Sequence, residues 1–307
     1  MPVHPDAQRF LDLLVDAPPL DTQTAEQNRA DLVNALPLTG EKAELASVVD
    51  ATLAGVPVRV YTPSDGEGGQ PAVVYLHGGG WVLGDVEIAD STCRALAVHA
   101  QAVVVSVDYR RAPEVPFPGA LEDTMAVTRA LLTGESPWAI DPRRVAVAGD
   151  SAGGNLAAVT AQQLRDHTPR LVHQVLIYPV TDLLAGDSGS YREFADGHFL
   201  TTRDLGYFYS QYAGTADRTD SRLSPAHATD LAGLPSATVV TAECDPLRDQ
   251  GEEYARAMAA AGTRVTTVRF AGQVHPFVFM GGIIEDAHAA RRFIGAQLRA
   301  AFSAGKA

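Results

Sequence analysis

The sequence predicts an α/β fold, in which a mostly parallel sheet is covered by helices on both faces. Short apolar runs without polar alternation suit strands that are buried on both sides. Such runs occur at 72–76, 102–107, 145–148, 175–178, 237–242 and 265–270. Helical patterns alternate with them and follow the last one, at about 88–99, 120–133, 153–166, 248–261 and 286–302. Repeated strand–helix units of this kind are typical of a parallel sheet.

The chain before residue 72 has a different pattern. The first 45 residues carry two helical apolar stripes, and we expect the second to end at Pro37. Two strands follow at 48–53 and 56–61, and the residues between them predict a hairpin turn.

A long insertion interrupts the later strand–helix alternation. Nearly sixty residues separate the strand that ends at Tyr178 from the strand that starts at Ala237. Long insertions in compact domains are usually lids or binding elements. We therefore expect a single domain over 1–307. Its cap comes from about 1–45 and about 181–226, and its core from about 46–180 and 227–307.

The charge balance limits the classes of partner. The chain has 24 Lys and Arg against 37 Asp and Glu, a net charge of −13. An acidic protein repels phosphate backbones, so nucleic acid is not an expected partner. The densest basic clusters are only pairs: Arg110-Arg111, Arg143-Arg144 and Arg291-Arg292.

Cysteine content and targeting signals favour a cytoplasmic protein. Cys93 and Cys244 are the only cysteines, too few for a cysteine-based zinc site, and no metal is expected. We expect two reduced thiols, with one disulfide between them as the alternative. The N-terminus lacks a basic region followed by an apolar stretch, which argues against a signal peptide. No apolar run approaches the about 20 residues that span a bilayer.

The strongest local motif is Gly-Asp-Ser-Ala-Gly-Gly at 149–154, between a predicted strand and a predicted helix. In that context Gly-x-Ser-x-Gly is typical of a nucleophile elbow. The flanking glycines remove Cβ atoms that would collide with strand and helix, and the helix N-terminus favours developing negative charge near Ser151. A tightly packed turn or a phosphate loop is the alternative. The absence of the Walker lysine and of Gly-x-Gly-x-x-Gly weakens the phosphate reading.

A second motif, His-Gly-Gly-Gly-Trp at 77–81, directly follows the strand 72–76. Three glycines allow the backbone to turn sharply and to point its N–H groups inward. Such donors stabilise the oxyanion of acyl transfer by about 2.7–4 kcal/mol each. The alternative is a flexible loop. A flexible loop, however, has no need of a His at its start and a Trp at its end directly after a buried strand.

A serine nucleophile needs a base, and in this fold class the histidine comes last in the chain. Only His275 lies between a predicted strand and the last helix, so it is the expected base. Four further histidines after Ser151 lie before a strand, in or beside the insertion, or within the last helix: His173, His198, His227 and His288.

The acid should follow the preceding strand, at 237–242. Asp245 lies at its tip beside Pro246 and is the expected acid. Asp249 is the second candidate, but we expect it in the first turn of the next helix, where a negative charge is favourable. Glu243 is expected on the strand, pointing away.

Together these motifs resemble the hormone-sensitive-lipase family of α/β-hydrolases. The segments 108–114 and 117–123 also match family segments, and the resemblance runs from about residue 45 to the C-terminus. It implies an eight-stranded mixed sheet, a helical cap and esterase activity on short acyl chains. It also implies that Ser151, Asp245 and His275 are catalytic. The resemblance assigns the oxyanion-hole N–H groups to Gly79, Gly80 and Ala152.

The sequence departs from the family pattern at two positions. Pro276 follows the base where the family commonly has glycine, which stiffens the loop, but we expect the triad to survive. Arg111 stands where the family usually has leucine, and the sequence offers no account of it.

We interpret the chain as a serine carboxylesterase that acts on short- to medium-chain acyl esters through an acyl-serine, without a cofactor. The alternatives are an amidase or a deacetylase of a specialised metabolite, and a non-catalytic ligand-binding homologue. The family includes plant hormone receptors that have lost the catalytic histidine. Because this chain keeps a histidine there, His275, the resemblance argues against a non-catalytic homologue. Trp81 and Phe199 are expected to contact substrate, with packing as the alternative. A homodimer is a family expectation only. The acidity predicts a preference for esters of neutral or cationic alcohols.

Overall fold

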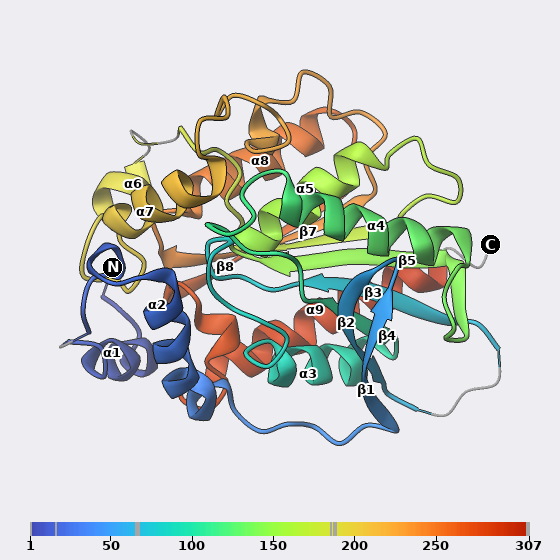
Figure 1. Cartoon of the computed structure of the whole chain (residues 1–307), viewed down its shortest axis with the longest axis horizontal. Helices are drawn as coiled ribbons and strands as arrows, with labels where there is room; N and C mark the ends of the chain where they lie inside the picture. The colour runs from blue at the N-terminus through green and yellow to red at the C-terminus, as the bar shows by residue number, and fades with distance from the viewer. Residues whose placement is uncertain (1, 16, 65–67, 185, 187–188, 305–307) are drawn as a thin grey trace.

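The structure is a computed structural model that describes residues 2–15, 17–64, 68–184, 186 and 189–304. Its eight-stranded sheet has the order β1-β2-β4-β3-β5-β6-β7-β8 (Figure 1). β2 runs antiparallel to β1 and to β4, and the remaining pairs are parallel. The strands are β1 (Ser47–Leu53), β2 (Val56–Thr62), β3 (Gln70–Leu76), β4 (Val103–Val107), β5 (Ile140–Asp150), β6 (His173–Ile177), β7 (Ser236–Cys244) and β8 (Val265–Val274). This confirms the predicted mixed sheet.

Helices cover both faces of the sheet (Figure 1). One face carries α3 (Asp90–Ala100) and α9 (Glu285–Ala304). The other carries α4 (Gly119–Thr133), α5 (Ala152–Gln163) and α8 (Arg248–Ala260). The predicted helices are therefore present, with ends shifted by a few residues.

Two apolar clusters, one on each face, form the core. Along β3 the side chains alternate: Val74 and Leu76 join the cluster under α4, α5 and α8, whereas Val73 and Tyr75 join the cluster under α3 and α9. All four are fully buried. Burying one side chain of the size of Val or Leu stabilises the fold by about 1.5–3 kcal/mol, so β3 is a well-anchored support for the loop that follows it.

The predicted hairpin between β1 and β2 is present. Its two turn residues, Ala54 and Gly55, have φ of 52° and 81°. Positive φ at both central residues is typical of the tight turn whose twist matches that of the flanking strands.

The N-terminal segment differs from the expectation at Pro37. The helices are α1 (Pro5–Asp12) and α2 (Ala25–Leu32), and a 3₁₀ helix over Val33–Thr39 follows α2 directly. Pro37 lies inside that 3₁₀ helix and does not end an apolar α-helix. A further 3₁₀ turn, Leu20–Thr22, lies between α1 and α2.

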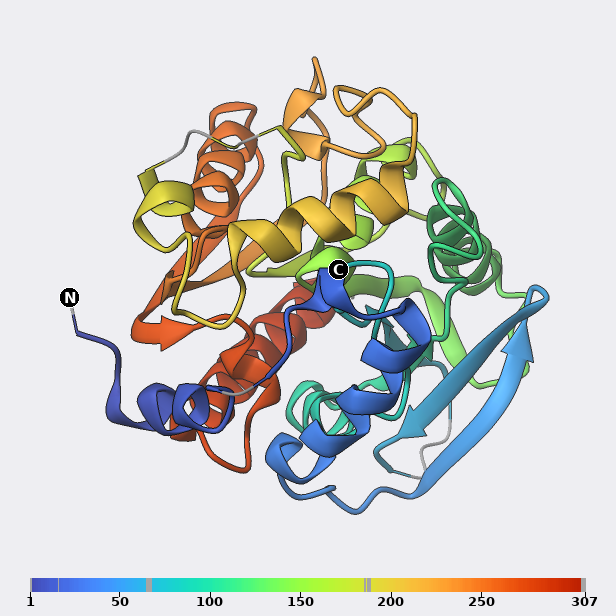
Figure 2. The ribbon, with the colours of Figure 1, turned by 60° about the vertical axis from the view of Figure 1, so that its left-hand side comes forward.

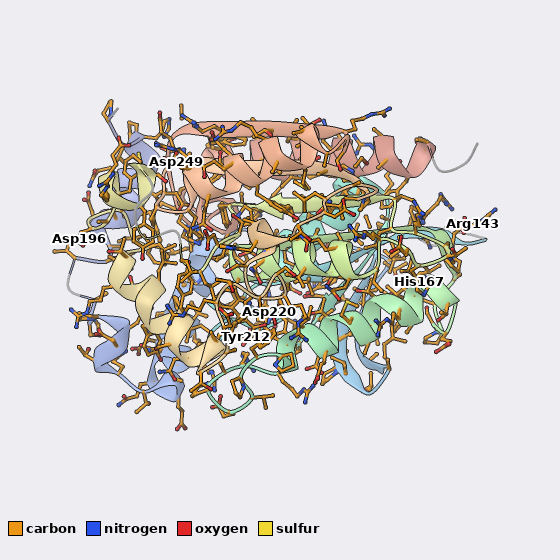
Figure 3. All side chains as sticks on the ribbon, turned by 90° about the horizontal axis from the view of Figure 1, so that it is seen from above. Arg143, His167, Asp196, Tyr212, Asp220 and Asp249 are labelled. Atoms are coloured by element: carbon orange, nitrogen blue, oxygen red, sulfur yellow. The ribbon has the colours of Figure 1, made fainter. Side chains whose placement is uncertain are left out.

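The two segments expected to form a cap lie side by side, beyond the carboxyl ends of the parallel strands (Figures 1 and 2). The insertion contains α6 (Gly189–Glu193), α7 (Thr202–Ala213) and a 3₁₀ turn, Pro225–His227. Arg203 on α7 pairs with Asp21 at 2.8 Å, and the rings of Phe10 and Phe199 are 5.3 Å apart. Seen from above, Asp196 of the insertion lies at the opposite end of the molecule from Arg143 and His167 (Figure 3).

Cys93 and Cys244 are both buried and form no disulfide, in agreement with the expected thiols. Among the described residues, no helix combines the length and the apolar character that crossing a membrane requires.

Candidate active site

Ser151 occupies a strained turn between β5 and α5. Its φ of 56° and ψ of −118° are unusual for a residue with a side chain. A Cβ atom on Gly149 would collide with the carbonyl of Gly153, and one on Gly153 would collide with the carbonyl of Leu76. Both glycines are therefore required by close backbone packing, as the motif predicts. The turn ends the strand and explains why α5 begins at Ala152.

Ser151, His275 and Asp245 form one continuous chain of hydrogen bonds. His275 Nε2 lies 3.0 Å from Ser151 Oγ, and His275 Nδ1 lies 2.8 Å from Asp245 Oδ2. All three residues are buried, and Ser151 is the most exposed of them at 8%. The structure thus brings together the three residues that the sequence selected, with Pro276 in place.

Asp245 and His275 owe their positions to neighbouring strand ends. β7 and β8 are parallel, so Asp245 just after β7 and His275 just after β8 lie at the same edge of the sheet. Asp245 is fixed further by the N–H of Leu247, which donates to its Oδ1 at 2.8 Å. The ring of Tyr178 lies 4.5 Å from that of His275 and restrains the imidazole.

β8 is longer than predicted. It continues to Val274, four residues beyond the apolar run at 265–270, so His275 follows the strand immediately. The apolar pattern fails there because the added residues include a glycine and a glutamine that bind neighbouring elements. The N–H of Gly272 donates to Glu243 Oε2 at 2.7 Å, and Gln273 Nε2 donates to Asp286 Oδ2 at 2.7 Å.

The rejected acid candidates have other partners. Asp249 lies in the first turn of α8, where its carboxylate accepts from Arg248 at 2.8 Å and from the N–H of Ser190 at 2.8 Å. Glu243 lies on β7 and binds Gly272, as described above.

The rejected histidines also lie elsewhere. His173 belongs to β6 and contacts the hydroxyls of Ser236 and Thr238 at 2.7 and 2.9 Å. His227 pairs with Asp182 at 3.1 Å, His198 contacts the carbonyl of Asp196, and His288 lies on α9.

The loop after β3 presents unpaired backbone donors. Gly79 and Gly80 have φ of 111° and 61°, a conformation that favours glycine. Within the described residues, no hydrogen bond engages the N–H groups of Gly79, Gly80 or Ala152. These are the three groups that the family resemblance assigned to the oxyanion hole, and that assignment stays a prediction.

Asp150 joins this loop to the nucleophile turn. Its Oδ1 accepts from the hydroxyl of Tyr75 at 2.9 Å and from the N–H of Gly78 at 3.0 Å. Burial raises the pKa of Asp150 to about 7, and the hydrogen bonds from Tyr75 and Gly78 oppose that rise. The contacts support a structural role for this carboxylate.

His77 is a buried part of the same loop. Its ring stacks on that of Tyr109 with 4.2 Å between centroids, and the Tyr109 hydroxyl donates to the His77 carbonyl at 2.7 Å. Burial lowers the pKa of His77 to about 4, which keeps the imidazole neutral near pH 7.

Two arginines that the sequence did not assign hold the loop from outside. Arg111 donates to the carbonyl of Gly84, which accounts for its charge at this position. Arg29 on α2 donates to the carbonyls of Val82 and Ala112, each at 2.8 Å. The contacts that hold the loop go to backbone carbonyls, so no side-chain pattern in the sequence could reveal either role.

The two residues expected to contact substrate lie in different surroundings. Trp81 is fully buried, and its ring stacks on Tyr212 of α7 at 4.4 Å. Phe199 is 41% exposed and packs against Phe10. Substrate contact by either stays a prediction. The structure adds Phe208 of α7, whose ring packs so closely on Gly80 that a Cβ atom there would overlap it.

The fold and the hydrogen-bonded serine, histidine and aspartate define a serine hydrolase of the α/β-hydrolase class. Residues 73–279 match the model of the α/β hydrolase fold family, and the chain belongs to that family.

Several proteins that resemble the chain in sequence or in structure are named as ester hydrolases. The chain is 43% identical to the carboxylic ester hydrolase LipN of Mycobacterium tuberculosis over 243 residues, which cover 75% of this chain and 64% of LipN. It is 45% identical to the carboxylesterase NlhH of the same species (74% and 72% covered), and 41% identical to an ethyl acetate hydrolase of Pseudomonas putida (76% and 74%). The ester hydrolase EH1AB1 from the metagenome of Lake Arreo superimposes with a TM-score of 0.93 at 37% identity, covering 98% and 99%. The chain is thus an enzyme of the carboxylesterase type.

Proposed function

We propose that this protein is a serine carboxylesterase that hydrolyses short- to medium-chain acyl esters through an acyl-serine intermediate. The observation that carries the proposal is the unbroken hydrogen-bond chain from Ser151 Oγ through His275 to Asp245. The relatives named above support the reaction class, and the ethyl acetate hydrolase among them supports a short acyl group.

In the first half-reaction Ser151 is the nucleophile. His275 Nε2 takes the hydroxyl proton as Ser151 Oγ attacks the ester carbonyl, and Asp245 holds the tautomer and stabilises the imidazolium. The N–H groups of Gly79, Gly80 and Ala152 stabilise the resulting oxyanion. The C–O bond to the alcohol then breaks, and the alcohol leaves with the proton from His275.

The second half-reaction releases the acid. Water gives a proton to His275 and its oxygen attacks the acyl-serine carbonyl, again with the oxyanion in the same hole. The bond between the acyl carbon and Ser151 Oγ breaks, the serine recovers the proton from His275, and the carboxylic acid departs. These steps use only side chains, backbone N–H groups and water.

The segments 1–45 and 181–226 act as the cap over this site, within one domain. Their position beyond the strand ends and the Arg203–Asp21 ion pair between them support this assignment. Trp81 and Phe199 remain proposed substrate contacts. We also propose a cytoplasmic location and a homodimer; β8 is an edge strand of the sheet, which supports such an interface along the part of the strand before Gly272, whose carbonyl is bonded by His4.

An acyl-chain profile tests the function. Nitrophenyl esters of increasing chain length and a matched anilide are assayed with the wild type and with Ser151→Ala. We expect the highest kcat/KM on short to medium esters, little anilide turnover and no activity of the variant. Anilide turnover equal to ester turnover would favour the amidase or deacetylase alternative.

A further inference from the structure

The fold places the two arginines of the basic pair Arg291-Arg292 in different surroundings. Both residues lie on α9, but Arg292 is exposed, whereas Arg291 is only 2% exposed and is one of the largest buried side chains. The reaction proposed above does not use either residue. A buried guanidinium is costly unless its donors are satisfied, so its partners indicate what it does.

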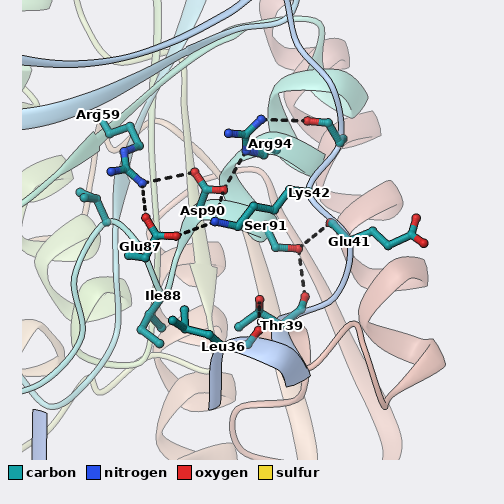
Figure 4. Close-up of polar contacts among 12 residues, drawn as sticks. Leu36, Thr39, Glu41, Lys42, Arg59, Glu87, Ile88, Asp90, Ser91 and Arg94 are labelled. Atoms are coloured by element: carbon teal, nitrogen blue, oxygen red, sulfur yellow. Dashed lines mark hydrogen bonds and ion pairs between the residues drawn. The ribbon is translucent and has the colours of Figure 1, made fainter. Parts of the chain in front are cut away.

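Arg291 binds backbone rather than a carboxylate. Its Nε donates to the carbonyl of Val278 at 2.9 Å, and its Nη2 donates to the carbonyls of Phe279 at 3.1 Å and Thr39 at 3.3 Å. Its Nη1 donates to Ser91 Oγ at 3.2 Å. Among the described residues, none of the ion pairs includes Arg291. Asp90, the carboxylate that precedes Ser91 in the chain, is paired with Lys42, Arg59 and Arg94 (Figure 4).

These acceptors come from two segments far apart in sequence. Val278 and Phe279 belong to the 3₁₀ turn Phe277–Phe279, which begins two residues after His275. Thr39 ends the 3₁₀ helix that follows α2, and its carbonyl also lies 2.9 Å from Ser91 Oγ (Figure 4). Arg291 therefore fastens the loop after His275 to the N-terminal segment.

The close packing around the guanidinium supports this joint. A Cβ atom on Gly281 would lie 2.9 Å from Arg291 Nη1, so a larger residue there would force the guanidinium to shift. The N–H of Gly282 donates to the carbonyl of Leu38 at 2.9 Å. The loop that carries His275 thus contacts the N-terminal segment both through Arg291 and directly.

We propose that Arg291 is a positioning residue: it holds the backbone after His275 so that the imidazole stays aligned between Ser151 and Asp245. The proposal rests on the proposed function, because it assigns a catalytic task to His275. Removing the guanidinium takes the donor from the carbonyls of Val278 and Phe279, whereas Thr39 keeps Ser91 Oγ, and so frees the loop. A displacement of about 1 Å at a catalytic group can lower the rate by about 100-fold.

Kinetics per active site test the proposal. One aliquot each of wild type, Arg291→Ala, Arg291→Lys and the matched control Arg292→Ala is labelled to completion with a fluorophosphonate, which counts the folded sites. Initial rates of a second, unlabelled aliquot on nitrophenyl butyrate, divided by that count, give kcat per site and KM. We expect Arg291→Ala to lose about 10- to 100-fold in kcat per labelled site, with KM nearly unchanged. Arg292→Ala should match the wild type.

Two further readouts distinguish positioning from stability. Ethylguanidinium at sub-denaturing concentration should restore part of the kcat of Arg291→Ala and leave Arg292→Ala unaffected. Arg291→Lys should retain an intermediate kcat, because an ammonium cannot reach all four acceptors. If Arg291→Ala does not fold, the kcat of Arg291→Lys tests the proposal instead.

An unchanged kcat per labelled site in both Arg291 variants, with only fewer sites or a lower Tm, would overturn the proposal. A wild type and an Arg292→Ala variant that both lack ester hydrolysis would instead refute the proposed function.

Discussion

Asp150 is a buried carboxylate next to the nucleophile in sequence, and its two hydrogen-bond donors come from another strand and loop, at Tyr75 and Gly78. Through these bonds Asp150 links the loop of Gly79 and Gly80 to the turn of Ser151, so the position of the loop depends on the turn. Its ionisation therefore affects the stability of the fold around the site.

The raised pKa of Asp150 predicts a pH dependence of stability. In the unfolded chain the carboxyl ionises near its ordinary pKa of about 3.9, whereas in the folded protein its pKa is about 7. The folded state binds the extra proton between these values, so this group's contribution to stability is largest below pH 4 and is lost as the pH rises towards 7. Relative to Asp150→Asn, the wild type should lose up to about 4 kcal/mol of unfolding free energy over that range.

Chemical denaturation of both proteins at several pH values measures this difference. Asp166→Asn is the control, because the side chain of Asp166 is 90% exposed. A wild type that keeps a constant stability difference from Asp150→Asn between pH 4 and 7 would contradict the raised pKa.

The residues of the site were predictable where a local pattern fixes them. Ser151 lies in a strand–turn–helix motif, and Asp245 and His275 follow strands, so position along the chain was sufficient. Arg29 and Arg291 were not predictable, because they bind carbonyls of segments far away in sequence. Every residue has a backbone carbonyl, whatever its side chain, so the sequence does not show which carbonyls an arginine will bind.

At the level of elements, α2 is attached to the core through Arg29. This side chain donates to the carbonyls of Val82 and Ala112 and makes two hydrogen bonds with Glu114, at 2.7 and 2.8 Å. The helix itself has little apolar burial, with only Asn28 buried within it. Only Ala25 and Leu32 of the helix pack, partly buried, against the apolar core, so its docking depends largely on polar contacts.

Replacing Arg29 by alanine should loosen α2 and the loop below it. We expect a loss of about 1–3 kcal/mol of unfolding free energy, since two carbonyls lose a charged donor, and a lower kcat/KM on short esters. Thermal unfolding and steady-state kinetics measure both effects. The control is Arg9→Ala on α1, which removes only a surface ion pair with Asp6. Equal behaviour of the two variants would refute the role of Arg29.

Element boundaries were less predictable than element types. The apolar runs located the six strands from β3 to β8, but β5 begins at Ile140 and β8 ends at Val274, beyond those runs. The ends of strands contain polar residues and glycines. The neighbouring strand, and not hydrophobicity, decides whether such residues pair. The 3₁₀ helix through Pro37 was missed for a similar reason: its conformation is compatible with proline but has no apolar period.

For the molecule as a whole, the net charge of −13 predicts selectivity among substrates of equal shape. At low ionic strength the acidic field should favour an ester of a cationic alcohol over a matched anionic ester by about 10-fold in kcat/KM. The ratio should fall in about 0.1 M salt, where charges are screened beyond about 10 Å. A higher kcat/KM for the anionic ester would show that local cations, such as Arg111, outweigh the overall charge.

The central claim is that Ser151 is the nucleophile of an esterase. The most direct measurement is labelling with a fluorophosphonate, located by peptide mass spectrometry, in the wild type and in Ser151→Ala, together with ester hydrolysis by both. We predict one label on Ser151 in the wild type, no label in the variant, and a loss of more than about 10⁴-fold in kcat. Equal labelling of the two proteins, or ester turnover that survives in Ser151→Ala, would contradict the account.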